Sequence, residues 1–244
     1  MINTPVALVH AGFQSAWLDV VRRLASSDWE TRNLVVQIQN TGAFDDVFDT
    51  LFAGFAHAQG LLGPKHVAYT IFPQGLYSDG QDAAHVFRAY NRPNGMYDRL
   101  HRKTHDWGTY FRRMTQYEGR DGPVNQLDNI ISAIRGRANL SKAAYTVVIQ
   151  HPGGETIRPL GGPCLNYLAI QAEPGDRRQI GLLAVYRNHD FLERAYGNYW
   201  GLCNLVRFLA KEVGGDPGPL TCISSHAFVD KKKTALRAFV EGLP

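Results

Sequence analysis

The chain has 244 residues, of which 44% are hydrophobic and 20% are charged, as expected for a globular protein with one substantial core. No apolar run approaches the length of a membrane span, and residues 1–19 lack the basic start and apolar block of a signal peptide, so we expect a soluble, cytoplasmic protein with no membrane partner. The net charge of +4 and the single basic run at 231–233 argue against nucleic-acid binding and favour a small anionic substrate.

Hydrophobic periodicity predicts an alternation of helices and strands. In chain order these are helix 14–26, strand 34–39, helix 45–57 stopped by Gly60, strand 66–72 ended by Pro73, helix 82–90, helix 127–134, strand 144–150, a hairpin of strands 165–171 and 179–187 with its turn at 173–176, helix 198–213, strand 220–225 and helix 231–241. No repeat or low-complexity tract divides the chain. The sequence therefore predicts a single α/β domain, residues 1–244, with a mixed sheet.

One cysteine stands out by its neighbours. Cys164 follows Gly162 and Pro163 at the start of a predicted strand, where the proline fixes the backbone that carries the thiol. A thiol is a good nucleophile near neutral pH when a nearby cation lowers its pKa, and Arg187 is the candidate cation. The alternative is a buried structural cysteine. That interpretation holds for the other two cysteines, which lie within the apolar stripes of a helix and a strand (Cys203 and Cys222).

Polar residues after the second hairpin strand form a second pattern. Arg187 and Asp190 stand three residues apart, and Asn198 begins a long amphipathic helix. Taken singly, the Arg–Asp pair could be a surface salt bridge and the asparagine a helix N-cap. Further along, His226 and Phe228 follow a short apolar strand.

This order and spacing resemble the thymidylate synthase superfamily, whose pattern is P-C, then R-x-x-D with an Asn eight residues after the Asp, then H-x-Y after a short apolar strand. The resemblance covers roughly residues 107–230, and residues 13–40 more weakly. It implies a three-layer α/β fold and a homodimer through the back of the sheet. It also implies transfer of a one-carbon unit from 5,10-methylenetetrahydrofolate to C5 of a pyrimidine nucleotide, giving a methylated or hydroxymethylated product.

The resemblance assigns a role to each matching residue. Cys164 matches the cysteine that adds to C6 of the pyrimidine, and Arg187 matches the arginine that holds the nucleotide phosphate and polarises the thiol. Asn198 matches the asparagine that reads the base; members acting on cytosine tend to have Asp there, so the amide favours a uracil-type ring. Asp190 matches the aspartate near the pterin, and His226 the histidine that contacts the sugar.

Several positions depart from the family pattern. Phe228 replaces the tyrosine of H-x-Y, which puts recognition of deoxyribose in question. Asn188 replaces a serine and is still expected to contact substrate, and Arg194 replaces a glycine that contacts folate. Of the two arginines that the partner subunit gives to the phosphate, only Lys142 keeps a charge. The catalytic glutamate has no clear match, and His85 is its best positional substitute.

Two further contacts complete the expected site. Trp107 is expected to contact the cofactor, and Arg32, in the weaker part of the resemblance, to contact substrate. The chain also ends at Pro244 without the tail that closes over substrate and folate in the true synthases. These departures favour a specialised relative over housekeeping synthesis of dTMP. The second hypothesis is a protein that keeps the fold and binds a nucleotide-like ligand, or serves as a partner subunit, without catalysis.

Three other motifs are weaker. Residues 6–12 with Ser15 look like the oxyanion loop of an α/β-hydrolase, but the chain has no G-x-S-x-G motif. His101 and His105 have a spacing able to hold a metal but lack a third ligand at family spacing, so we expect no metal site. The glycine-rich stretches lack the lysine of a phosphate-binding loop.

Overall fold

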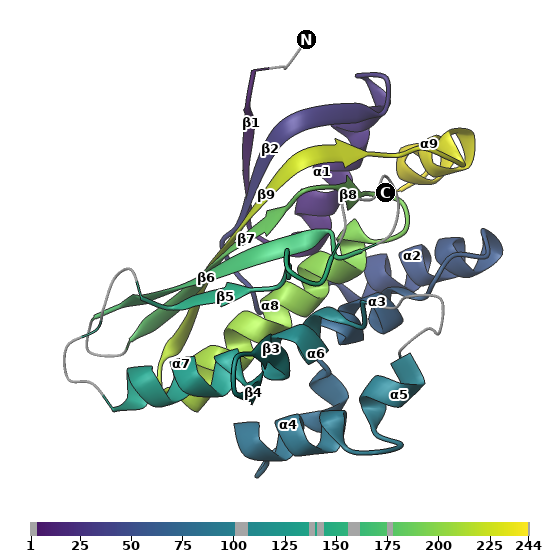
Figure 1. Cartoon of the computed structure of the whole chain (residues 1–244). Helices are drawn as coiled ribbons and strands as arrows, with labels where there is room; N and C mark the ends of the chain where they lie inside the picture. The colour runs from purple at the N-terminus through teal and green to yellow at the C-terminus, as the bar shows by residue number, and fades with distance from the viewer. Residues whose placement is uncertain are drawn as a thin grey trace.

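The computed structural model describes residues 4–100, 107–136, 140, 144–155, 162–174 and 178–243. Its centre is a mixed sheet with the strand order β1-β2-β9-β7-β6-β5, in which β8 pairs with the end of β9 (Figure 1). The strands are β1 (Val6–His10), β2 (Glu30–Ile38), β5 (Thr146–Val148), β6 (Leu165–Glu173), β7 (Gln179–Tyr186), β8 (His189–Asp190) and β9 (Asp216–Phe228). Strand β9 runs parallel to β7 and β8 and antiparallel to β2.

The helices pack on this sheet in two further layers. They are α1 (Phe13–Ala25), α2 (Asp46–Ala58), α3 (Pro64–Ile71), α4 (Ala83–Asn91), α5 (Met96–Leu100), α6 (Tyr110–Thr115), α7 (Gln126–Arg135), α8 (Ala195–Glu212) and α9 (Lys233–Glu241), with a short 3-10 turn at Gln74–Leu76. Helix α8 lies between the sheet and α3, and almost all of its side chains are buried. The predicted fold class, a three-layer α/β fold with a mixed sheet and packed helices, is confirmed.

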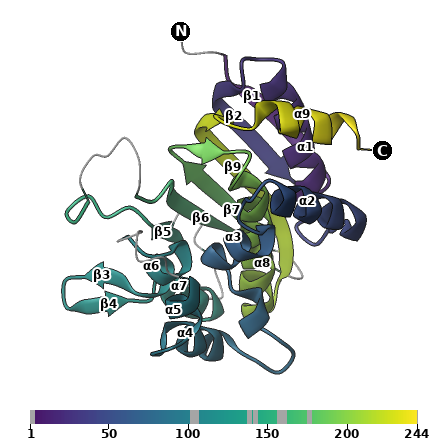
Figure 2. The ribbon, with the colours of Figure 1, turned by 90° about the vertical axis from the view of Figure 1, so that its right-hand side faces the viewer.

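The remaining small elements gather at one end of the molecule. Figure 2 shows the ribbon of β3 (Tyr117–Gly119) and β4 (Gly122–Val124) beside α4, α5, α6 and α7, away from β1. None of the helices in the described part of the chain is long and apolar enough to cross a bilayer.

Most predicted elements are confirmed. The helices predicted at 14–26, 45–57, 82–90, 127–134, 198–213 and 231–241 correspond to α1, α2, α4, α7, α8 and α9, and the strands predicted at 34–39, 144–150, 165–171, 179–187 and 220–225 correspond to β2, β5, β6, β7 and β9. The hairpin is confirmed by the antiparallel pairing of β6 with β7. Gly60 has a φ of +64° just beyond α2, as expected of a residue that ends a helix.

The strand predicted at 66–72 is wrong, because this segment is the helix α3. Its β-branched, alternating residues suggested a strand, but Pro64 occupies the first turn, where a helix tolerates proline. The buried positions Pro64, Val67, Ala68 and Ile71 recur at helical spacing and face α8. A tertiary contact therefore overrides the local preference.

Two glycines on α8 allow this close contact. A Cβ on Gly197 would lie 2.6 Å from the Pro64 carbonyl oxygen, and one on Gly201 would lie 2.6 Å from the Ala68 carbonyl oxygen. Both distances are shorter than real Cβ contacts, so a larger residue would push α3 away from α8. The packing of the two helices thus depends on positions next to Asn198.

Gly201→Ala is expected to lower the free energy of unfolding by about 1–3 kcal/mol, because the added methyl group overpacks a rigid helix contact. Gly54→Ala is the matched control, since a Cβ at Gly54 on α2 meets nothing within 4 Å. That control should be neutral or slightly stabilising, because alanine is the better helix former. Denaturant unfolding of both variants checks the expectation, and equal stabilities would contradict it.

The two faces of the sheet differ. One face carries fully buried residues such as Leu34, Cys222 and Tyr186 beneath α1 and α8. Side chains on the other face are half-buried or exposed, and the strand register aligns them into a row across six strands: Ala7, Val35, Ile223, Val185, Tyr167 and Val148. We call this row of six residues the outer sheet face.

Candidate active site

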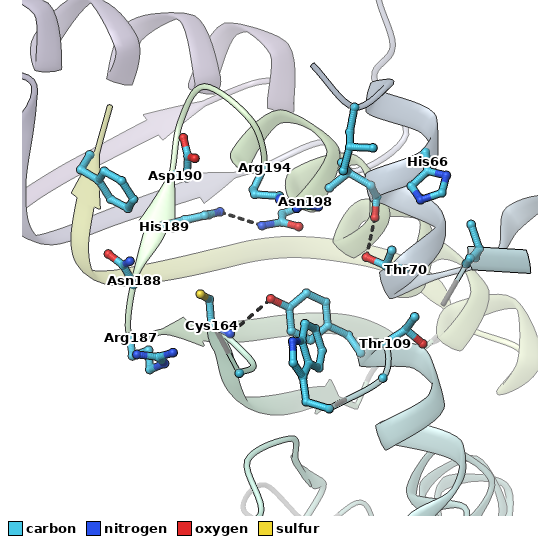
Figure 3. Close-up of a pocket in the computed structure, with 18 residues that line it drawn as sticks. His66, Thr70, Thr109, Cys164, Arg187, Asn188, His189, Asp190, Arg194 and Asn198 are labelled. Atoms are coloured by element: carbon cyan, nitrogen blue, oxygen red, sulfur yellow. Dashed lines mark hydrogen bonds between the residues drawn. The ribbon is translucent and has the colours of Figure 1, made fainter. Parts of the chain in front are cut away.

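A cavity of about 240 Å³ opens where the strands β6, β7 and β8 meet the start of α8 (Figure 3). Helix α3 and the segment 107–110 form its other walls. Six residues that the sequence singled out line it together: Trp107, Cys164, Arg187, Asn188, Asp190 and Asn198. Residues from four separate segments of the chain therefore meet in one cavity.

Cys164 stands just before β6 and is half-buried at the cavity wall. Its backbone N–H donates to the Tyr110 hydroxyl at 3.3 Å, and its carbonyl accepts from the Arg187 N–H at 2.9 Å. Burial raises the pKa of the Cys164 thiol, while the guanidinium groups of Arg187 and Arg194 act in the opposite direction. Burial is the largest of these effects, so without a ligand the thiol is mainly protonated near neutral pH.

The cavity holds two arginines and one carboxylate. The Arg187 side chain is anchored by a hydrogen bond from Nε to the Pro163 carbonyl oxygen at 3.1 Å. Arg194, the N-cap residue of α8, also lines the cavity. Asp190 accepts from the backbone N–H groups of Leu192 and Glu193 through Oδ1, and burial raises the pKa of its carboxyl group. The site therefore suits an anionic ligand.

Asn198 is held by a buried polar network. Its Nδ2 lies 3.2 Å from His189 Nε2, and His189 Nδ1 lies 2.9 Å from the Ser224 hydroxyl. Because an amide nitrogen can only donate, His189 Nε2 accepts and the ring proton sits on Nδ1. The His189 ring stacks on Tyr186 with 4.1 Å between centroids, and burial lowers the pKa of His189 to about 3. The histidine is therefore neutral.

This network leaves one atom without a partner. Asn198 is only 3% exposed, and its Oδ1 makes no hydrogen bond to any residue that the structure describes. A buried amide oxygen without a partner costs roughly 1–3 kcal/mol, and a ligand N–H would satisfy it. The second hydrogen of Nδ2 is also available, so the amide can offer one acceptor and one donor to a ligand.

His226 lies behind the cavity wall. Its Nδ1 lies 2.8 Å from Asn188 Oδ1 and its Nε2 lies 3.2 Å from the Glu30 carboxylate. His226 is not among the lining residues, whereas Phe228, which stacks on it, is. His226, the residue predicted to contact the sugar, is therefore connected to the cavity only by its hydrogen bond to Asn188.

Two other predicted residues, Arg32 and His85, lie outside the cavity. Arg32 is exposed on β2, paired in register with His226, and does not line the cavity. His85 lies in the first turn of α4, also outside the lining residues, so the structure does not bring it to Cys164. Lys142 and the pair His101 and His105 fall outside the described residues. Within the described residues, no group of three metal-ligating side chains occurs.

Sequence reasoning missed part of the cavity wall. His66 and Thr70 come from α3, the segment that was predicted to be a strand. Tyr110, beside Trp107, was passed over, although its hydroxyl contacts the backbone of Cys164. His189 lies between Asn188 and Asp190, which the sequence had singled out. Nothing in the sequence indicated that it would form a hydrogen bond with Asn198.

The cavity brings together groups that can bind an anion and groups that can form hydrogen bonds. The cavity offers a thiol, two guanidinium groups, an amide with a free acceptor and the ring of Trp107 within one small volume. A thiol can add to an electron-poor ring carbon, arginines bind phosphate, and an amide can distinguish ring edges.

The chain has distant relatives among known proteins, at 26–29% identity over half of its length. No family model matches the chain. It is similar to proteins named "Putative thymidylate synthase" from Methanocaldococcus jannaschii, at 29% identity over 126 residues, and from Methanosarcina barkeri, at 28% over 121 residues. Each match covers 50% of this chain, and 55% and 52% of the two relatives. The chain spans about half the length of the curated relatives it matches, and the similarity supports a distant thymidylate synthase-like relationship.

Proposed function

We propose that this protein transfers a one-carbon unit from 5,10-methylenetetrahydrofolate to C5 of a uracil-type pyrimidine nucleotide, giving a methyl or hydroxymethyl product. The observation that carries the proposal is the meeting of Cys164, Arg187 and Asn198 in one cavity, where the amide presents a buried oxygen without a partner. The distant thymidylate synthase-like relatives support the same class of reaction.

Each residue has a defined part in this reaction. The Cys164 thiolate forms a bond to C6 of the ring, and the π electrons move toward C5 and O4, which makes C5 nucleophilic. C5 then bonds to an electrophile, either a solvent proton or the one-carbon unit, and loss of the original C5 proton with cleavage of the sulfur–carbon bond restores the C5–C6 double bond. Arg187 binds the phosphate and favours the thiolate, since its charge lowers the thiol pKa. Asn198 accepts from N3–H through Oδ1 and donates to O4 through Nδ2.

The residues around the thiol fit the cofactor. Trp107 presents a ring, and the half-buried Asp190 keeps one carboxylate oxygen for a ligand N–H, as a flat pterin would need. The folate supplies the one-carbon unit when bound. Binding, orientation and proton handling at C5 belong to the side chains of this chain.

Release of tritium from C5 tests the reaction. UMP, dUMP, CMP and dCMP labelled at C5 are incubated with the protein, with and without methylenetetrahydrofolate. Release from the uracil nucleotides is expected to exceed release from the cytosine nucleotides. Binding without release would favour the second candidate, a nucleotide-binding protein without catalysis, which the buried and mainly protonated thiol allows. The absence of both binding and release would refute the proposal.

Arg187→Ala is expected to weaken nucleotide binding by one to two decades while leaving nucleoside binding nearly unchanged. Hydrogen bonds to a charged group contribute roughly 1.5–3 kcal/mol, and only the nucleotide carries the phosphate. Arg32→Ala is the matched control, because Arg32 lies outside the cavity. Calorimetry with UMP and uridine measures both effects. Equal losses for the two ligands would assign Arg187 another role.

We also propose that the protein is a homodimer through the outer sheet face, because a continuous row of half-exposed apolar side chains suits burial against a second copy. Val185→Lys, at the centre of that row, is expected to convert a particle of twice the 27.2 kDa chain mass into a monomer. Val47→Lys is the control, since Val47 is 68% exposed on α2. Light scattering measures the particle mass of the wild type and of both variants. A monomeric wild type would overturn the proposal.

A further inference from the structure

A second cavity lies on the other side of α8. It has a volume of about 300 Å³ and is bounded by α3, α8 and the loop at 41–44. On α8, the residues lining this cavity are Trp200, Cys203, Asn204 and Arg207, which recur at helical spacing. Asn198 precedes Trp200 by two residues, about 200° around the helix, so the two cavities use opposite faces of α8.

The charge in this second cavity is positive. Lys65 and Arg207 are the charged residues that line it, and neither forms a salt bridge with another described residue. Lys65 Nζ lies 5.7 Å from the centre of the Tyr69 ring, at the rim. Two exposed cations beside a hollow favour an anionic group.

The apolar wall is aromatic. Trp200 lies 5.2 Å from Phe44 and 6.4 Å from Phe13, measured between ring centroids, and Phe44 remains 41% exposed. An exposed phenylalanine beside a half-buried tryptophan leaves apolar area that a flat ring could cover.

A buried amide gives the independent indication of a ligand. Asn204 is 4% exposed and lines the cavity, yet its side chain makes no hydrogen bond to any residue in the described part of the chain. Neither amide atom of Asn204 is among the fully buried atoms without a partner in the described residues, so the amide faces the cavity and is open to a bound molecule. An acceptor or donor from a bound molecule would satisfy it.

We propose that this cavity is a second ligand site, which takes a small molecule that combines an aromatic ring with an anionic group. The ring packs against Trp200 and Phe44, the anion lies between Lys65 and Arg207, and Asn204 hydrogen-bonds to the ligand. The site is separate from the cavity of Cys164 and does not depend on the activity proposed for that cavity.

Calorimetry of the protein with 1-naphthyl phosphate and 1-naphthoate tests the site. The comparison ligands are 1-naphthol, which lacks the anionic group, and inorganic phosphate, which lacks the ring. Both aromatic anions are expected to bind at least tenfold more tightly than either comparison ligand. Arg207→Gln should weaken binding about tenfold or more. Lys211→Gln, which makes the same charge change on the same helix outside the cavity, should leave it unchanged.

Two further variants separate this site from the first cavity and from loss of folding. Arg187→Gln should leave naphthyl phosphate binding intact, since Arg187 belongs to the other cavity. Asn204→Leu removes the amide with little change in shape, so it should weaken binding without lowering Tm. Absence of binding, or binding that follows Arg187 instead of Arg207, would overturn the proposal.

Discussion

Cys164→Ser is expected to lower the release of tritium from C5 of a uracil nucleotide by at least about three orders of magnitude. A serine hydroxyl is a far weaker nucleophile than a thiolate at neutral pH, and removal of a nucleophile produces losses of this size or larger. Because serine is smaller and uncharged, and Cys164 is only half-buried, nucleotide affinity and the midpoint of thermal unfolding should change little.

The matched control is Cys203→Ser. Cys203 is buried on α8 outside the first cavity, so its replacement should cost stability but spare the release of tritium. Comparison of release, UMP binding and Tm for the two variants separates chemistry from folding. Full activity of Cys164→Ser would exclude the thiol from the reaction.

Asn198→Asp is expected to shift the preference between uracil and cytosine nucleotides by one to two decades. In the wild type, Oδ1 and the second Nδ2 hydrogen match N3–H and O4 of uracil, whereas the exocyclic amine of cytosine would meet a donor. Each mismatch costs roughly 1–3 kcal/mol. An aspartate can accept from that amine, so CMP should gain affinity relative to UMP.

Competition binding of UMP against CMP measures the shift. Asn129→Asp provides the control, because it makes the same substitution at an exposed position of α7 that lines neither cavity. An unchanged preference in Asn198→Asp would mean that the base is read by another residue.

Much of the fold was predictable from the sequence, because most elements follow local periodicity. The exception at α3 is instructive. Its residues alternate as in a strand, but in the fold they form a helix that packs against Gly197 and Gly201, more than a hundred residues away. Strand β1 was likewise not predicted as a strand, because residues 6–12 were considered only as a hydrolase loop.

The site residues could be predicted where they belong to a sequence motif. They could not be predicted where only the packing of distant segments brings them together. Cys164, Arg187 and Asn198 were chosen from their spacing, and the structure places all three in one cavity. Their functional roles stay predictions. His85 was chosen by position alone, and the fold puts it on α4 outside that cavity. No local pattern could reveal the support of Asn198 by His189 and Ser224, because β9 brings Ser224 to this point through sheet pairing.

Burial has opposite effects on the pKa values of two groups at this site, the His189 ring and the Cys164 thiol. With a pKa lowered to about 3, the ring stays neutral at every pH above about 4, so the donor and acceptor pattern of Asn198 does not change there. The thiol behaves differently, since burial raises its pKa and its reactive form accumulates only as the pH rises. A rise in pH from neutrality should therefore speed turnover by increasing the thiolate fraction, without changing the hydrogen-bonding pattern that His189 imposes on Asn198.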